Sequence, residues 1–155
     1  MGWKKYLKII LVSMFLMILQ TGFFSEFFGE TFPILIFCYS LGLFALGKTE
    51  ESYLSAFIGG LLLDLVSSNF LGFSSTVFLS VLLTGVAVRK VFSNNVLLYI
   101  LVIIIFQFVY FLFSLNFAFH FVISPTFWVS VFSNYVTFLL FTFLLRKFSY
   151  APKPF

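Results

Sequence analysis

Apolar and polar positions along the chain fall into long blocks. Short polar stretches separate six apolar runs, at about 9–25, 31–47, 52–67, 71–88, 96–116 and 125–145. A helix of about 20 apolar residues is long enough to cross the hydrocarbon core of a bilayer. The pattern therefore predicts an all-α, polytopic membrane protein with six transmembrane helices, forming a single membrane domain over residues 1–155.

Local signals mark the ends of several runs. Pro33 and Pro125 stand where proline is tolerated, in the first turn of the second and sixth predicted helices. The sequence Ser67-Ser68-Asn69 predicts a turn between the third and fourth helices. The first run lacks the small residues of a signal-peptide cleavage site, so we expect a retained helix there.

The basic residues lie at the edges of the apolar runs, and they decide the predicted topology. With the N-terminus inside, the inner segments are 1–8, 47–52, 89–95 and 146–155, which together hold all nine Lys and Arg residues. The outer segments hold Glu26, Glu30 and His120, with no Lys or Arg. Because cytoplasmic loops are enriched in Lys and Arg, this distribution predicts six spans with both ends in the cytoplasm (N-in/C-in).

The composition excludes several classes of function. Only 9% of the residues are charged, and the net charge of +4 reflects topology, so we do not expect nucleic-acid binding. Cys38 is the only cysteine, which excludes an internal disulfide and a cysteine metal site. With one His, one Asp and no catalytic motif, the chain is predicted to be no enzyme and to bind no cofactor. His120 is expected to be an interfacial aromatic residue.

Asp64 is the one acidic residue inside an apolar run, and it is expected near the outer end of the third helix. A carboxylate is costly in hydrocarbon, so it needs a partner. Three alternatives are open. Asp64 accepts hydrogen bonds from hydroxyl and backbone N–H groups near Gly72 to Ser75, or it pairs with His120, or it accepts a basic or hydrogen-bonding group from another protein.

Small residues line the same predicted helix. Ser52, Ala56 and Gly60 recur every four residues, with Ser55 and Gly59 beside them. This pattern allows two helix backbones to approach closely. The contact is either with another helix of this chain or with a partner protein. In the second case the partner is another protein or a second copy of this chain, which would form a homodimer. The candidate interface residues are then Ala56, Gly59, Gly60, Asp64, Gly72, Pro33 and His120.

The last three predicted helices carry polar stripes, which are Thr76, Ser80 and Thr84, then Gln107, Tyr110 and Ser114, then Ser130, Ser133, Asn134 and Thr137. Unsatisfied polar groups are expensive in hydrocarbon, so these stripes are expected to face one another. They either hydrogen-bond between helices or line a cavity for a small ligand.

A short signature carries a resemblance to a known family. The sequence Gly59-Gly60-Leu61-Leu62-Leu63-Asp64, followed by Leu71-Gly72, resembles the signature of the rod shape-determining protein MreD family. That family also has six spans in a chain of similar length and a proline early in the second span, which Pro33 matches. The polar neighbours often seen around that proline are missing here.

The resemblance implies a non-enzymatic scaffold of the bacterial cell-elongation complex in the cytoplasmic (inner) membrane. Such a protein binds the single-span protein MreC and helps to couple MreB filaments to peptidoglycan synthesis by RodA and its transpeptidase, and so to cell shape. The edges formed by Arg89, Lys90, Arg146 and Lys147 are expected to contact anionic membrane lipid or cytoplasmic partners. The alternative function is the substrate-binding S component of an energy-coupling factor vitamin transporter.

Overall fold

The computed structural model describes residues 3–24, 34–67, 70–92, 96–114, 122 and 124–149. Glu26, Glu30, Pro33 and His120 lie outside the described residues, and so does the alternative that pairs Asp64 with His120. All regular secondary structure in the described ranges is helical, as predicted. The elements are α1 (Trp3–Ile18), η1 (Leu19–Phe24), α3 (Leu35–Ala45), α4 (Thr49–Ser67), α5 (Phe73–Phe92), α6 (Val96–Ser114) and α7 (Pro125–Ser149).

Helix α3 forms the centre of the fold. Its residues are mostly apolar on every side, and such a helix is buried inside a protein or lies in a membrane. All residues from Leu35 to Phe44 are buried. The Phe37 ring stacks on Phe106 of α6, with ring centroids 3.7 Å apart, and it lies 5.6 Å from Phe78 of α5. Three helices therefore meet in one aromatic cluster around α3.

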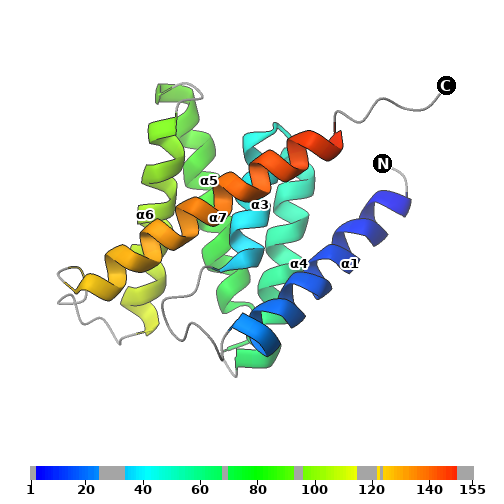
Figure 1. The fold of residues 1–155 in the computed structure, drawn as a ribbon, viewed down its shortest axis with the longest axis horizontal. Helices are drawn as coiled ribbons and strands as arrows, with labels where there is room; N and C mark the ends of the chain where they lie inside the picture. Colours follow the sequence, from blue (N-terminus) through cyan, green and yellow to red (C-terminus); the bar gives the residue numbers. More distant parts are fainter. Residues whose placement is uncertain are drawn as a thin grey trace.

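The other helices surround α3 in an ordered way (Figure 1). Helix α4 packs between α3 and α5, α6 packs on α5, and α1 packs on the outer side of α4. Helix α7 contacts α3 and α6 and crosses the bundle at a slant. Followed along the sequence, successive helices run in alternating directions, which is the arrangement that a chain weaving through a slab requires.

Much of the outer surface is apolar. Large hydrophobic side chains are exposed along α1 and α7, including Phe15, Ile18, Phe132 and Phe143. Each of these four side chains is more than 60% exposed. A monomeric soluble protein rarely exposes such an extended apolar surface. The described surface is therefore suited to contact with lipid or with other apolar helices.

The helix lengths differ from those predicted for spans. Among the described helices, only α7 combines the length and the hydropathy of a membrane-crossing helix, over Pro125–Lys147. The shorter apolar helices are Tyr6–Gly22, Leu35–Ala45, Phe73–Arg89 and Leu97–Leu112. The helical class is thus established for the described residues.

Candidate functional site

Asp64 joins the end of α4 to the start of α5. Its carboxylate oxygens accept hydrogen bonds from the backbone N–H of Gly72 at 2.8 Å and of Ser74 at 3.0 and 3.1 Å. The first N–H groups of a helix have no partner within the helix, and the helix N-terminus is its positive end. The carboxylate therefore satisfies and complements the N-terminus of α5. Gly72, at φ +92°, makes the turn that brings these N–H groups to it.

Of the alternatives for Asp64, the structure shows the first one, hydrogen bonding near Gly72 to Ser75, with backbone N–H groups as the donors. The pairing with His120 lies outside the described residues. Asp64 is 1% exposed, so its carboxylate is not open to a partner protein. Asp64 is thus a structural residue of the α4–α5 turn.

Gly60 allows α4 and α5 to approach each other closely. A Cβ atom at Gly60 would lie 2.5 Å from both the backbone N and the Cα of Ser75. The Ser75 hydroxyl donates to the backbone carbonyl of Phe57 at 2.9 Å, which fixes the same contact from the other side. A Cβ atom at Gly59 would overlap the Cγ2 of Ile36 in α3. Two adjacent glycines therefore serve two different neighbouring helices.

The remaining small residues of α4 face α3. The Ser52 hydroxyl donates to the carbonyl of Ser40 at 2.7 Å, and the hydroxyls of Ser40 and Ser55 are 3.0 Å apart. Ala56 is fully buried. The small-residue row is thus filled by helices of this chain, which is the intramolecular alternative. Ala56, Gly59 and Gly60 do not form an open surface for a partner in this structure.

Asn134 is the hub of a second buried polar cluster. Its Oδ1 accepts from the backbone N–H of Ile34 at 3.0 Å, and its Nδ2 donates to Gln107 Oε1 and to the Ser130 carbonyl, both at 2.9 Å. The Cys38 thiol lies 3.4 Å from the same Oδ1. One side chain thereby links α7 to α6 and to the start of α3. The predicted interhelical hydrogen bonding is present here, between the stripes of α6 and α7.

The polar stripe of α5 does not join this cluster. Thr76, Ser80 and Thr84 are exposed, on the outer side of the bundle. The Thr76 and Thr84 hydroxyls donate to the carbonyls of Gly72 and Ser80, four residues earlier in the same helix. The expectation that all three stripes face one another is therefore wrong for α5. A hydroxyl satisfied within its own helix has no need to turn inward.

Replacing Asn134 by leucine is expected to lower the free energy of unfolding by about 2–3 kcal/mol. The substitution leaves the Ile34 N–H and the Gln107 side chain without their partner, and each orphaned buried group costs about 1–3 kcal/mol. The measurement is unfolding of purified protein in mild-detergent micelles by added sodium dodecyl sulfate. Ser133→Ala, at the half-buried neighbouring position, is the control and is expected to change little. Equal stability of both variants would contradict this role of Asn134.

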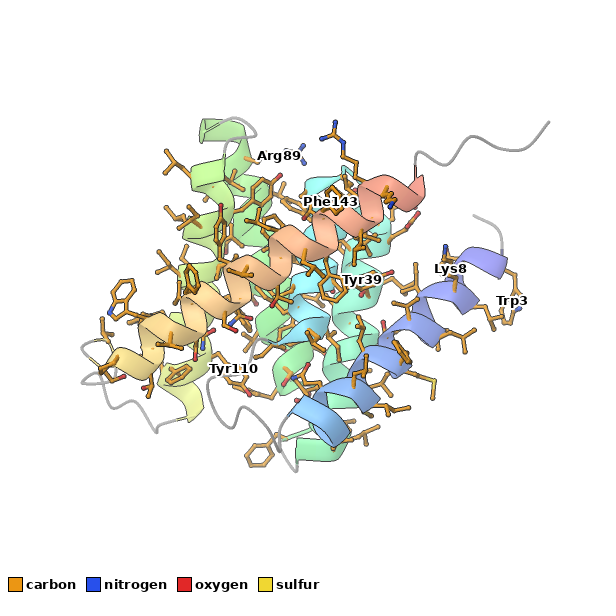
Figure 2. The ribbon with its side chains drawn as sticks, in the orientation of Figure 1. Trp3, Lys8, Tyr39, Arg89, Tyr110 and Phe143 are labelled. Carbon is orange, nitrogen blue, oxygen red and sulfur yellow. The ribbon has the colours of Figure 1, made fainter. Side chains whose placement is uncertain are left out.

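Basic side chains gather at one end of the bundle. The Arg89 guanidinium lies over the Phe44 ring, 5.6 Å from its centroid, so the end of α5 meets the end of α3. Arg146 and Lys147 lie in the last turn of α7, next to Leu145, whose Cδ1 would contact a Cβ at Gly42 of α3. Figure 2 shows Lys8 on α1 about level with Tyr39, and Tyr110 toward the end of the bundle opposite Arg89. The Lys90 side chain is outside the described set.

The described residues contain no group of three or more His, Cys, Asp or Glu that could hold a metal ion. Comparison of the chain with protein-family models, with curated proteins and with solved structures gives no match. The candidate site therefore consists of two sets of contacts between helices, one around Gly60 and Asp64 and one around Asn134, and of the basic residues at one end of the bundle.

Proposed function

We propose that the chain is a non-enzymatic membrane scaffold that crosses the bacterial cytoplasmic membrane six times, with both termini in the cytoplasm. The observation that carries this proposal is the position of the basic residues. The ends of α3, α5 and α7 share one end of the bundle, and the Arg89, Arg146 and Lys147 side chains lie there. A cytoplasmic surface is where such charges are retained.

The outer surface supports membrane residence independently of charge. Exposed large hydrophobic residues cover α1 and α7, while the polar side chains of Asn134, Gln107 and Asp64 are buried and hydrogen-bonded. A protein with apolar groups outside and paired polar groups inside fits a lipid environment, where each unsatisfied polar group is expensive.

The motif behind the family resemblance has a coherent structural role. Gly60, Asp64 and Gly72 together form one close contact between α4 and α5. We therefore extend the proposal to the function that the resemblance implies: a subunit of the cell-elongation complex that binds MreC and helps to couple MreB filaments to peptidoglycan synthesis by RodA and its transpeptidase. In this proposal the α4–α5 contact holds the bundle together. MreC binds the outer faces of the helices and not this contact.

The test of this function is co-purification. We expect the MreC-like single-span protein of the same organism to be recovered with the tagged chain from detergent-solubilised membranes, several-fold above an unrelated single-span protein expressed at the same level. Because Gly59 and Gly60 are buried within the bundle, variants at these positions would test folding rather than binding. Recovery of the two single-span proteins in equal amounts would contradict the proposed partner.

A further inference from the structure

Three basic side chains at one end of the bundle have no acidic partner. Arg89 of α5 and the pair Arg146 and Lys147 of α7 make no ion pair within the part of the chain that the structure describes. The Phe44 ring attracts the charge of Arg89, but it offers no oxygen or nitrogen acceptor to the five N–H donors of the guanidinium. These donors are therefore available to an oxyanion, whose geometry a guanidinium matches.

Both sets of cations meet the last turns of α3, but α3 does not use them as caps. The Phe44 ring contacts Arg89. A Cβ at Gly42 would lie 3.3 Å from the Cδ1 of Leu145, the residue before the two α7 cations. The last carbonyls of a helix lack partners within the helix, and basic side chains often supply them. In α3 these carbonyls accept instead from the backbone N–H groups of residues 46–48, at 3.0–3.2 Å.

The acidic residues described at this end do not balance the cations. Helix α4 begins there, after the short loop from α3, and its first turn contains Glu50 and Glu51. The ends of α3, α5 and α7, with the loop after α3, contribute four cations, namely Lys48, Arg89, Arg146 and Lys147. The remaining described carboxylate, Asp64, caps α5 at the opposite end. The local excess of two positive charges attracts anions.

An exposed apolar surface leads directly to the α7 cations. Large exposed side chains recur every three or four residues along α7 and so share one side of the helix. They form the α7 stripe, Phe132, Val136, Leu140 and Phe143. The exposed Arg146 and Lys147 follow Phe143 by three and four residues, so they lie on the same side, one turn further on. A ligand with long apolar chains and an anionic group matches both parts of this surface.

From these observations we propose that the basic end of the bundle binds an anionic phospholipid. The lipid phosphate is held by Arg146 and Lys147 and attracted by Arg89 across the end of α3, and the acyl chains lie along the α7 stripe. Neither an inorganic anion nor an acidic protein segment would use both parts of this surface. The inference rests on the proposed membrane-spanning function and adds a lipid partner to it.

The test adds lipid to the purified full-length chain in non-ionic detergent and follows thermal unfolding by circular dichroism. Dioleoylphosphatidylglycerol is the anionic probe, dioleoylphosphatidylcholine carries the same acyl chains on a zwitterionic headgroup, and glycerol 3-phosphate has no acyl chains. A ligand that binds only the folded state raises the unfolding midpoint, so we expect phosphatidylglycerol to raise it at the lowest concentration. Phosphatidylcholine is expected to act only at higher concentration, and glycerol 3-phosphate not at all.

Variants locate the lipid on the molecule. Each basic side chain at a membrane surface contributes about 1 kcal/mol, which is about five-fold in affinity. The double variant Arg146→Gln, Lys147→Gln is therefore expected to need about 25-fold more phosphatidylglycerol for the half-maximal shift. Both side chains are exposed, so the midpoint without lipid is expected to stay the same. Lys8→Gln removes an exposed cation from α1, about level with Tyr39 (Figure 2), and is expected to leave the lipid requirement unchanged.

The outcomes that would overturn the inference are separate from those that would overturn the function. Equal effects of phosphatidylglycerol and phosphatidylcholine, or of phosphatidylglycerol and glycerol 3-phosphate, would refute the anionic lipid and leave the membrane-spanning function intact. An equal loss in Lys8→Gln and in the double variant would refute the location. Membrane residence is scored separately, by resistance of the expressed chain to extraction from cell membranes with alkaline carbonate. Extraction of the chain would overturn both the inference and the function on which it rests.

Discussion

Replacing Gly60 by alanine is expected to lower the free energy of unfolding by about 2–3 kcal/mol. The added Cβ would lie 2.5 Å from the backbone N and Cα of Ser75, and backbone atoms at that distance have to move. Overpacking of a well-packed interior costs about 1–3 kcal/mol. The better helix propensity of alanine, about 1 kcal/mol, offsets only part of a backbone displacement.

Two other glycines are compared in the same detergent unfolding experiment. Gly59→Ala places its Cβ on the Cγ2 of Ile36, a buried methyl held by the stiff χ1 of a β-branched residue, so its cost is expected to be comparable with that of Gly60→Ala. Gly22→Ala meets nothing within 4 Å and is expected to be neutral or slightly stabilising. If Gly60→Ala were as stable as Gly22→Ala, the close α4–α5 contact would be refuted.

Replacing Asp64 by alanine is the second change with a large expected effect, again a loss of about 2–4 kcal/mol. The N–H groups of Gly72 and Ser74 lose their acceptor at a buried position, and hydrogen bonds to charged groups contribute about 1.5–3 kcal/mol each. Loss of a negative charge at the helix N-terminus adds to this cost. The start of α5 is expected to loosen, with faster amide hydrogen exchange at its first turn.

Matched variants separate the cap from the charge. Asp64→Asn keeps one acceptor oxygen and is expected to recover part of the lost stability. Glu50→Ala removes an exposed carboxylate from the first turn of the neighbouring helix α4 and is expected to cost below about 1 kcal/mol. The proposed cap would be refuted if Asp64→Ala and Glu50→Ala had the same small effect.

The sequence was sufficient to predict the helices because their ends are chemically marked. Pro125 begins α7 as expected, and the predicted run 96–116 corresponds to α6 at Val96–Ser114. The helix expected over 9–25 begins earlier, at Trp3, since the lysines before the apolar run are compatible with a helix. The helix expected over 31–47 is described only over Leu35–Ala45, and Pro33 lies outside the described residues.

Which side of each helix faces inward was harder to predict. Periodicity shows that Thr76, Ser80 and Thr84 share a side, but not whether that side faces the bundle or its exterior. The exterior is as apolar as the interior here, so the usual contrast between the two is lost. The neighbours of Gly59 and Gly60 in α4 were equally hard to predict. The spacing of these glycines predicts a close contact but does not identify Ile36 or Ser75 as the neighbour.

Cysteine accessibility tests the central claim, the six-fold crossing with the basic end in the cytoplasm. Cys38 is the one native cysteine and is fully buried, so wild-type protein is expected to give little background labelling. Single cysteines at exposed Leu71 and Thr126 mark one end of the bundle, and a cysteine at exposed Lys147 marks the other. A membrane-impermeant thiol reagent is added to intact cells and to permeabilised cells. The account predicts labelling of Leu71→Cys and Thr126→Cys in intact cells, and of Lys147→Cys only after permeabilisation. Labelling of Lys147→Cys in intact cells, or protection of Leu71→Cys there, would contradict it.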